Sequence, residues 1–494
     1  MTLQMSIHNI KGINCLDFSF PLEKGLYAIT GENGSGKSTL ISCASTVFYQ
    51  MPMVEYFGKP SNASILFTLD KAKRGWICDG KLWSKQSSKE KMLINGFYEG
   101  SIIFGNRFKD KSLSALRSLD NVKHNNLIEA SDFVKNNLGL ILHDDNNYYS
   151  DLYILNRETA TELGLVGVSY FYKTISGEYI SQARMSTGEN LLTSILHSLK
   201  MIHDKRSNND GGRPCIVFLD EIELALHSSA LRRLVIFLKE ISSELNLAIF
   251  FSTHSIELLR EIKAQNIFYL QKNVDDSVSI TNPCYPAYAT RNLYSDDGYG
   301  NDMVILVEDD LAKMIVERLL VEKNLINNIR IKVLPTGGWT NTITMAYDVV
   351  SSNLLIKGTK LAIILDRDIK SEVPDFLKKH RQYSGLTMDF LPINSLEKYL
   401  RDNLFVKFNN DFYNILNTYV FQKRPLNVIL GTYKRDNVKD DESGKTLYGF
   451  ILNELRSMRK DREDLVEIVV KYIMEYEKEK TEELSRYIAD KIKQ

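Results

Sequence analysis

The chain has 494 residues, which is longer than one compact core usually serves, so two or three domains are expected. Its 62 basic and 62 acidic side chains give zero net charge, which excludes a whole-molecule field that attracts nucleic acid. No apolar run approaches the roughly 18 residues of a membrane span, and the first residues show no signal sequence. The 5 cysteines are scattered without a C-x-x-C pair. This usage favours a reducing compartment, so we expect a cytoplasmic protein without a disulfide framework.

The first part of the chain predicts short strands. Alternating apolar segments at 5–10 and 16–20 predict antiparallel strands that lead into a buried strand at 26–30. Further strands are expected at 64–69, 76–83 and 101–104, and a mixed, largely helical region at 110–180. The lysines between 71 and 91, with Trp76 and Trp83, predict either a local nucleic-acid patch or a solvated hairpin edge.

The segment Gly31–Thr39 reads GENGSGKST and matches the phosphate-binding loop pattern G-x-x-x-x-G-K-[ST]. Its glycines let the backbone approach phosphate oxygens closely, and the helix that follows presents free N–H groups. Lys37 is expected to reach the β- and γ-phosphates, and the Ser38 hydroxyl to ligate Mg²⁺. The candidate nucleotide-binding residues here are Asn33, Gly34, Gly36, Lys37, Ser38 and Thr39.

A second polar helix start follows at Ser186-Thr187-Gly188-Glu189. It predicts a second anion-binding nest, although the same residues also suit a plain helix N-cap. The interval between Thr39 and Ser186 is short and lacks heptads, which excludes the long coiled-coil arms of some ATPases.

Two apolar runs predict strands that are buried on both faces. The first, 215–219, ends in Asp220 and Glu221; Asp220 is expected to hold Mg²⁺ through water, and Glu221 to orient or deprotonate the attacking water. The second, 247–251, leads into Thr253 and His254, and His254 is a candidate sensor of the γ-phosphate.

In this order, the four motifs resemble the ABC-type ATPase head of transporters, SMC proteins and DNA-repair ATPases, over roughly residues 1–280. The resemblance implies a head-to-head dimer in which Ser186 and Gly188 of one subunit contact the ATP bound at Lys37 of the other. Asn106 or Gln50 is the candidate for the glutamine that such heads place after the early strands. Transport is not expected, because the sequence has no membrane span.

Beyond a linker at 282–302, a second α/β pattern begins. A strand at 303–307 ends at Glu308, and a helix is expected at 310–321. A strand at 331–334 precedes Thr336-Gly337-Gly338, and a strand at 361–365 precedes Asp366-Arg367-Asp368. Alternating side chains in this D-x-D segment can share a divalent cation. The alternative is three ordinary turns at strand ends.

This layout resembles the Toprim domain, and an ABC head followed by Toprim is the arrangement of the OLD (overcoming lysogenization defect) family of nucleases. The resemblance implies that Glu308 is a metal ligand or acid–base residue and that Asp366 and Asp368 are metal ligands. Glu397 would be a further acid and metal ligand. Lys445, in a late Gly-Lys element, would stabilise charge on the scissile phosphate. The sequence departs from the family at Ala312, where a second acid is usual; Asp309 or Asp310 are the candidates to replace it.

We therefore predict an α/β protein: an ABC-type P-loop ATPase domain at 1–281, a linker at 282–302, a Toprim core at 303–400, and Toprim elements with a helical tail at 401–494. The tail from 461 onward predicts a charged helix or helical pair. The resemblance implies an ATP-binding, Mg²⁺-dependent DNA endonuclease or nickase that also accepts Mn²⁺ and forms a homodimer or higher homo-oligomer through its ATPase heads. It also implies a role in prokaryotic DNA processing, or in anti-phage defence with a separately encoded partner. The alternatives are a RecF-like repair ATPase and an ATP-gated scaffold whose second domain does not cut DNA.

Overall fold

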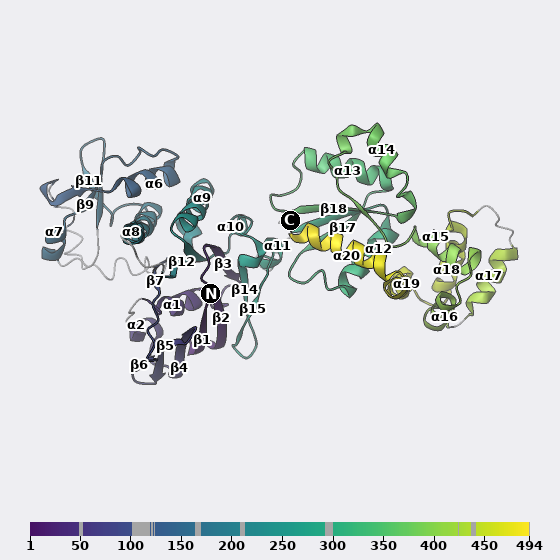
Figure 1. The fold of residues 1–494 in the computed structure, drawn as a ribbon, viewed down its shortest axis with the longest axis horizontal. Helices are drawn as coiled ribbons and strands as arrows, with labels where there is room; N and C mark the ends of the chain where they lie inside the picture. The colour runs from purple at the N-terminus through teal and green to yellow at the C-terminus, as the bar shows by residue number, and fades with distance from the viewer. Residues whose placement is uncertain are drawn as a thin grey trace. The chain divides into compact units, whose positions relative to one another are not determined.

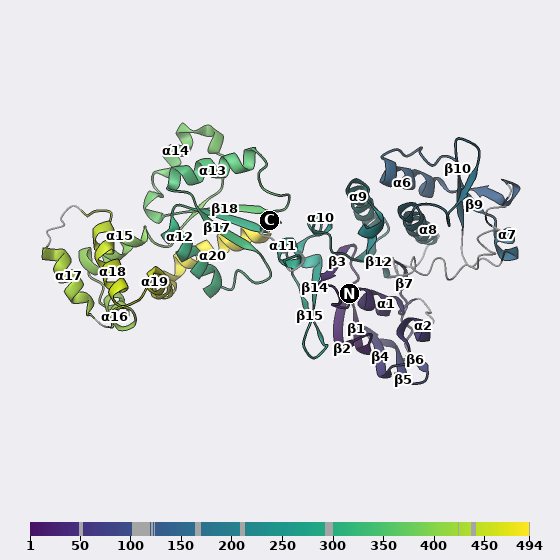
Figure 2. The same cartoon turned by 180° about the vertical axis from the view of Figure 1, so that it is seen from behind.

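The chain forms two compact units, Met1–Ser295 and Asp296–Gln494, in a computed structural model (Figures 1 and 2). The structure describes residues 1–48, 53–100, 119, 122, 124–163, 169–207, 213–291, 300–422, 424–435 and 441–493. The boundary between the units falls inside the predicted linker. Gln50, Asn106 and the strand predicted at 101–104 lie outside the described residues.

A six-stranded sheet forms the centre of the first unit. Its strand order is β15 (Val278–Thr281), β14 (Ile267–Lys272), β3 (Gly25–Gly31), β13 (Leu247–Ser252), β12 (Cys215–Asp220) and β7 (Asn95–Gly100). All neighbours run parallel except β14 and β15. Leu26 and Ala28 of β3 join one apolar core, whereas Tyr27 and Ile29 join another. The sheet is therefore buried on both faces, as the continuous apolar runs predict.

One face of this sheet packs against α1 (Lys37–Ser45) and a second, antiparallel sheet. That sheet has the order β2 (Ile13–Pro21), β1 (Thr2–Ile10), β4 (Ser61–Leu69), β5 (Ala72–Asp79) and β6 (Trp83–Ser87), with α2 (Met53–Phe57) close to it in the sequence. The strand expected at 76–83 is instead the end of β5, a turn and the start of β6. The Asp79 carboxylate accepts hydrogen bonds from the backbone N–H groups of Lys81 and Leu82, both at 2.9 Å, and this Asx-type turn reverses the chain.

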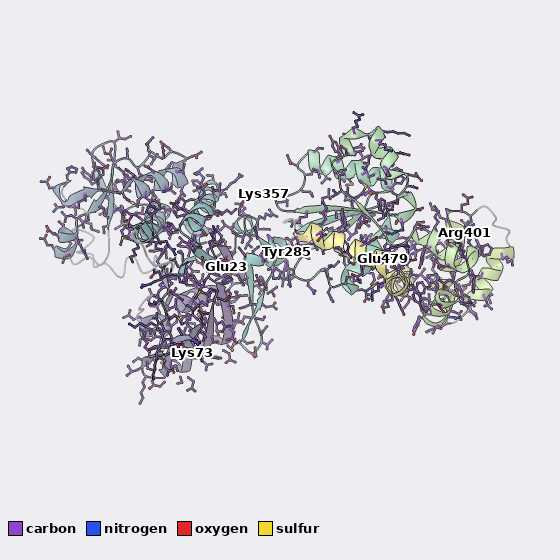
Figure 3. The ribbon with its side chains drawn as sticks, in the orientation of Figure 1. Glu23, Lys73, Tyr285, Lys357, Arg401 and Glu479 are labelled. Atoms are coloured by element: carbon purple, nitrogen blue, oxygen red, sulfur yellow. The ribbon has the colours of Figure 1, made fainter. Side chains whose placement is uncertain are left out.

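This hairpin also contains the lysine-rich segment. The Arg74 guanidinium turns inward and donates to the carbonyls of Val47 and Met92, so it is not available to a ligand. The Lys85 amine lies 5.8 Å from the centre of the Trp76 ring, and Lys73 is exposed (Figure 3). The hairpin-edge interpretation fits these contacts better than a nucleic-acid patch.

The other face of the central sheet is covered by α6 (Asp132–His143), α8 (Thr187–Ser207) and α9 (Ser228–Glu244). Beyond them lies an antiparallel sheet of the order β11 (Tyr179–Ser181), β10 (Tyr170–Lys173), β9 (Leu152–Leu155) and β8 (Leu127–Glu129), with α7 (Arg157–Glu162). The mixed, largely helical region expected at 110–180 contains α6 and α7 in its described part, but the strands β8, β9, β10 and β11 were not expected there. These strands are only 3 to 4 residues long, too short for a two-residue period to be visible in the sequence.

Short elements complete the first unit. They are the 3₁₀ helices η1 (His124–Asn126), η2 (Ile222–Ala225) and η3 (Ala264–Asn266), and the helices α10 (Ile256–Leu259) and α11 (Pro286–Ala289).

The second unit is built on a parallel sheet with the order β17 (Ile331–Pro335), β16 (Met303–Val307), β18 (Lys360–Leu365) and β19 (Asp389–Phe390). Helix α13 (Trp339–Ser351) packs on Leu306, Ile363 and Leu365, and α12 (Asp310–Glu322) also packs against the sheet. The strands predicted at 303–307, 331–334 and 361–365 are all present.

Helices make up the rest of this unit. The segment after β18 holds η5 (Arg367–Ile369), α14 (Val373–Lys379) and η6 (Arg381–Tyr383), and the segment after β19 holds α15 (Leu396–Arg401), a π-helical turn η7 (Asp402–Val406), α16 (Asn410–Tyr419), α17 (Leu426–Arg435) and α18 (Lys445–Ser457). The tail is a helical pair, α19 (Arg462–Tyr476) and α20 (Lys478–Lys493). Helix α19 packs on α12, and α20 packs on β18.

Candidate functional site

The loop between β3 and α1 is shaped by glycines in backbone conformations that other residues rarely adopt. Gly36 precedes α1 with φ 98°, and Gly31 has φ 149°. A Cβ on Gly31 would lie 2.3 Å from the Leu270 carbonyl oxygen, and one on Gly36 would lie 2.8 Å from Ile13 Cδ1. The loop therefore wraps tightly at the carboxyl end of β3, where parallel sheets bind ligands.

Lys37 begins α1 and is only 5% exposed. Its Nζ donates to the carbonyl oxygens of Gly31 at 3.2 Å and Glu32 at 3.0 Å. Burial lowers the Lys37 pKa to about 8, although Glu221 and Asp220 oppose that shift. A buried amine held over a glycine-rich loop is suited to bind a phosphate, whose negative charge would compensate the desolvation.

The Ser38 hydroxyl reaches across to the end of β12. Its Oγ donates to Asp220 Oδ1 at 3.2 Å, and the Ser252 hydroxyl donates to the same oxygen. Asp220 is fully buried, and its second oxygen Oδ2 has no hydrogen-bond partner among the described residues. Burial raises the Asp220 pKa, and the two serine hydroxyls oppose the rise. A buried carboxylate oxygen without a partner, next to a hydroxyl, fits a Mg²⁺ ion held by Ser38 and Asp220.

Glu221 follows directly, in an unusual backbone conformation. Its φ of 52° and ψ of 48° are left-handed, and its N–H donates to the Ser252 hydroxyl at 2.9 Å. This sparsely populated conformation turns the chain sharply after β12, and such conformations cluster at functional sites. Glu221 acts electrostatically on both Lys37 and His254, so these three side chains belong to one site.

Glu223 is a residue of this site whose role the sequence did not reveal. Its Oε1 accepts from the Thr253 hydroxyl at 2.9 Å and from the His254 N–H at 2.8 Å. It thereby fixes the segment after β13. His254 is half-buried, and burial followed by the charge of Lys37 lowers its pKa, which favours the neutral imidazole. An acid two positions after Glu221 was the only sequence signal for this contact.

Ser186 and Glu189 cap α8. Ser186 N donates to Glu189 Oε2 at 2.8 Å, and Glu189 N donates to Ser186 Oγ at 3.3 Å, which is a capping box. Gly188 is required by close packing, because a Cβ there would lie 2.6 Å from the Ala225 carbonyl oxygen in η2. No hydrogen bond joins Ser186 or Gly188 to Lys37 in the described part of the chain. The local role is thus the plain cap, and a contact with nucleotide stays a prediction.

In the second unit, two predicted acidic residues meet at the carboxyl ends of β16 and β18. The backbone N–H of Asp366 donates to Glu308 Oε1 at 2.8 Å. Burial, together with the charges of Glu308, Asp309, Asp368 and Glu397, raises the Asp366 pKa to about 8. The glycines after β17 complete this edge, because Gly337 and Gly338 donate to the Glu308 carbonyl at 2.8 and 2.9 Å.

The other predicted acids have internal partners. Asp368 Oδ2 lies 2.8 Å from Lys398 Nζ, and Lys445 acts electrostatically on Glu397. The backbone at Gly444, with φ 74°, packs closely against Glu397. A Cβ on Gly444 would lie 2.2 Å from the Glu397 carbonyl oxygen, so this contact requires glycine. Asp309 caps α12 by accepting from Ala312 N at 2.8 Å, and Asp310 is exposed.

The oxygen ligands of this edge are chemically suited to Mg²⁺ or Mn²⁺, but their arrangement is not. No group of three or more His, Cys, Asp or Glu side chains in the described ranges could hold a metal ion as placed. We therefore derive no metal-dependent step here, and the metal ligands Glu308, Asp366, Asp368 and Glu397 stay predictions.

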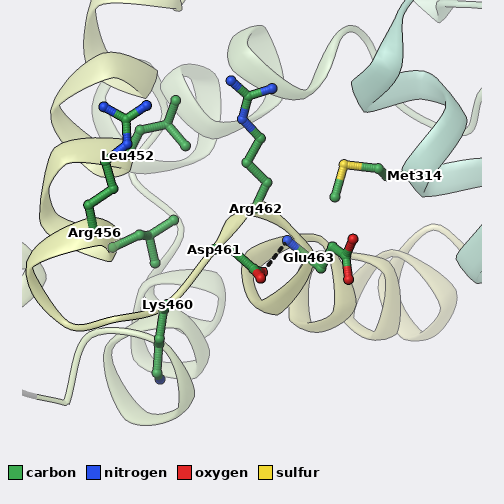
Figure 4. Close-up of a pocket in the computed structure, with 8 residues that line it drawn as sticks. Met314, Leu452, Arg456, Lys460, Asp461, Arg462 and Glu463 are labelled. Atoms are coloured by element: carbon green, nitrogen blue, oxygen red, sulfur yellow. Dashed lines mark hydrogen bonds between the residues drawn. The ribbon is translucent and has the colours of Figure 1, made fainter.

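A cavity of about 360 Å³ lies between α12, α18 and the start of α19 (Figure 4). In the figure, the Arg456 and Arg462 guanidinium groups extend to the same side, whereas Lys460 points away. Lys460 Nζ donates to the Tyr419 and Val420 carbonyls, and Arg462 acts electrostatically on Glu397. The cavity is lined by Met314, Leu452, Leu455, Arg456, Lys460, Asp461, Arg462 and Glu463.

Two family models match the first unit. One, described as "AAA domain", matches residues 4–112, and the other, described as "AAA domain, putative AbiEii toxin, Type IV TA system", matches residues 108–260. Each spans less than half of the chain. No curated protein matches this sequence. The first unit thus carries a P-loop ATPase domain of the AAA type, which implies nucleotide binding together with Mg²⁺.

Solved structures with some similarity are SMC head domains. The head domain from Thermotoga maritima shares 14% identity over 57% of this chain and 99% of that chain, with a TM-score of 0.31. An SMC head bound to the C-terminal winged-helix domain of ScpA shares 14% identity over 57% of this chain and 96% of that chain, with a TM-score of 0.35. An SMC head bound to the C-terminal domain of ScpA derived from Pyrococcus furiosus shares 13% identity over 57% of this chain and 95% of that chain, with a TM-score of 0.35. Similarities of this size establish neither a shared fold nor a shared function.

No helix within the described ranges is long and apolar enough to cross a membrane.

Proposed function

We propose that this chain is a Mg²⁺-dependent ATPase whose nucleotide cycle controls the cutting of DNA by its second unit. The observation that carries the ATPase assignment is the meeting of Lys37, Ser38 and Asp220 at the carboxyl ends of β3 and β12, with one buried Asp220 oxygen left without a hydrogen-bond partner. This arrangement supports binding of a phosphate and of a cation side by side.

Each residue has a role that its contacts support. Lys37 binds the β- and γ-phosphates, Ser38 and Asp220 hold Mg²⁺, and His254 contacts the γ-phosphate. Bound Mg²⁺ neutralises charge on the phosphates. Glu221, in its left-handed conformation at the end of β12, orients or deprotonates the attacking water.

We further propose that two copies associate through their ATPase domains. Ser186 and Thr187 are exposed at the start of α8, and no hydrogen bond joins Ser186 to Lys37 within the described residues. Ser186 and Gly188 would therefore act on the nucleotide of a second copy. The test is light scattering of wild type and Ser186→Arg with ATP: only wild type should dimerise, and equal dimerisation of both would contradict the proposal.

For the second unit, we propose cleavage of DNA at the edge that holds Glu308, Asp366 and Asp368, with Lys445 beside Glu397. The support is the direct Glu308–Asp366 contact and the mutual electrostatic influence of the acids. Association with anti-phage defence, a separately encoded partner and the cytoplasm is proposed only from the OLD-type motif order.

Incubation of the purified full chain with supercoiled plasmid and Mg²⁺ or Mn²⁺ tests this proposal. We expect nicked or linear DNA, and loss of cutting in Asp366→Asn. Asp375→Asn, on the exposed helix α14, is the matched control and should cut normally. Cutting that survives Asp366→Asn would show that another site is responsible.

A second candidate is an ATP-gated protein, such as a RecF-like repair ATPase or a scaffold, whose second unit binds but does not cut. The Asp368–Lys398 ion pair, the capping role of Asp309 and the absence of a metal-ligand group among the described residues favour it. This candidate predicts that the protein binds DNA or a partner protein, and that the plasmid stays intact with each metal and each nucleotide.

A further inference from the structure

A second cavity, of about 590 Å³, lies in the first unit outside the ATP site. It is formed by the turn after α6 and by the β10–β11 hairpin, and it is lined by Tyr148, Tyr149, Ser150, Asp151, Tyr172, Lys173, Thr174, Ile175 and Ser176. Three of these nine side chains are tyrosines. A volume of this size is typical of small-molecule pockets.

The tyrosines are held in place before anything binds. The Tyr148 ring stacks on the His143 ring with centroids 3.6 Å apart and an interplanar angle of 12°, yet Tyr148 is 56% exposed. Tyr149 is 2% exposed. Its ring centroid lies 5.0 Å from that of Tyr148 and 6.0 Å from that of Tyr172, and both pairs are arranged edge to face. Little side-chain freedom would be lost when a flat ring stacks here.

Polar groups surround these rings. Ser150, Thr174 and Ser176 supply hydroxyls, and Asp151 supplies a carboxylate. The Lys173 amine lies 6.0 Å from the centre of the ring of Tyr179, a residue outside the set that lines the cavity. The hairpin that carries them is fixed, because the Thr174 and Ser176 hydroxyls are 2.8 Å apart and Thr174 N donates to the Glu178 carbonyl at 2.8 Å. Aromatic faces beside hydroxyls and a carboxylate are the chemistry that stacks on an unpaired nucleobase and hydrogen-bonds to its edge.

Hydrogen bonds connect the cavity to the start of α8. The Tyr149 hydroxyl donates to Glu189 Oε1 at 2.7 Å, and Glu189 Oε2 accepts from Ser186 N at 2.8 Å. His143 Nε2 lies 3.2 Å from the Tyr149 hydroxyl. Since the hydroxyl proton is given to Glu189, His143 donates to the Tyr149 oxygen. Burial lowers the His143 pKa, which favours the neutral ring, and its Nε2–H tautomer makes this donation.

We infer that the cavity binds an unpaired nucleobase of single-stranded nucleic acid, and that Tyr149 and Glu189 transmit its occupancy to Ser186. A base that stacks on Tyr148 would shift the His143–Tyr149 pair, and with it the carboxylate that holds Ser186. Tyr149 is a positioning residue in this scheme. The binding half of the inference stands alone, whereas the coupling half rests on the proposed ATP hydrolysis.

The binding half is tested by fluorescence anisotropy of a short fluorescein-labelled oligodeoxyadenylate with the full chain in low salt. We expect Tyr148→Ala to weaken binding about tenfold, because one stacking face is lost. Tyr419→Ala is the matched control, since Tyr419 is 60% exposed and lies in the other unit; its affinity should equal that of wild type. The measurement is made without nucleotide, so failure of the ATPase assignment would leave this test intact.

Equal affinities of wild type and Tyr148→Ala would overturn the inference. Failure of wild type to bind the oligonucleotide would overturn it as well. If Tyr148→Ala then altered ATP-dependent dimerisation in light scattering, the occupant of the cavity would be a second copy of this chain.

The coupling half is tested by Tyr149→Phe, which keeps the ring but removes the hydroxyl. We expect that, at a saturating concentration of the oligonucleotide, the ATPase rate of this variant no longer responds to the oligonucleotide. Tyr419→Phe, at the exposed tyrosine of α16 in the other unit, should respond normally. A response that persists in Tyr149→Phe would refute the coupling.

Discussion

The two units place carboxylates at the same topological position, the carboxyl ends of adjacent parallel strands, and yet treat them differently. In the first unit, Asp220 contacts only hydroxyl groups through one oxygen, and its other oxygen has no partner among the described residues. In the second unit, Glu308 accepts a backbone N–H and Asp368 is paired with Lys398. The first edge therefore keeps a carboxylate oxygen that could accept a cation. At the second edge, a backbone N–H and a lysine already contact Glu308 and Asp368.

Topology therefore decides where acidic side chains gather, and their neighbours decide what they do there. A hydroxyl orients a carboxylate but leaves its charge in place. A lysine neutralises the charge, and a cation that replaces it has to compensate for the lost ion pair.

Removal of the Lys37 amine should have the largest effect on the first site. We expect Lys37→Ala to lower the ATPase rate about 100- to 1000-fold, because the transition-state charge loses its stabilising contact. Steady-state phosphate release measures this effect. Lys73→Ala, at an exposed position of β5, is the control and should turn over ATP normally. Near-normal turnover in Lys37→Ala would remove the basis for the site.

Glu221→Gln separates binding from chemistry at the same site. Loss of a positioned base should slow hydrolysis by about 100-fold or more, while Lys37, Ser38 and Asp220 still hold nucleotide. Nucleotide extracted from the purified variant should be mostly ATP, as measured by ion-exchange chromatography. Extraction of mainly ADP would show that another group activates the water.

The Asp366 carboxyl makes the second unit sensitive to pH. Burial, helped by Glu308, raises its pKa from 3.8 to about 8, so the folded unit binds the proton more tightly than the unfolded chain. The contribution of this one group to the stability of the unit is full below about pH 4 and falls as the pH rises toward 8, by up to about 1.4 kcal/mol per pH unit. Urea unfolding, followed by fluorescence of Trp339 in a background of Trp76→Phe and Trp83→Phe, measures this slope.

Asp366→Asn should flatten the slope, since the amide does not titrate. Asp375→Asn, at an exposed carboxyl, should keep it. An unchanged slope in Asp366→Asn would assign the pH dependence to a different group.

The smallest effect concerns Lys398. Its side chain is 37% exposed and that of Asp368 is 22% exposed, so the ion pair should contribute only about 0–1 kcal/mol to stability. Lys398→Met should therefore unfold at nearly the wild-type urea concentration but bind Mn²⁺ more tightly in calorimetry, because Asp368 is released. Lys378→Met breaks the exposed pair with Asp375 and serves as the control. Unchanged Mn²⁺ affinity would show that the pair does not oppose metal binding.

Much of this architecture was readable from local pattern. The GENGSGKST segment fixed the place of the P-loop, and the apolar runs that end at Asp220, Val307 and Leu365 predicted buried parallel strands. Local pattern missed what depends on contacts between distant residues. Glu223 acts on residues 30 and 31 positions away, and Tyr149 reaches Glu189 across 40 positions. The pairing of Asp368 with Lys398 was likewise invisible, because neither residue carries a signal for the other.

The close approach of Gly188 to Ala225 has a mechanical consequence. The start of α8 touches the segment that follows Glu221 without room for even a methyl group. A movement of that segment toward α8 during ATP cleavage would displace the start of the helix, because no space separates Gly188 from Ala225. A change at Glu221 would then reach the start of α8, where Ser186 is exposed.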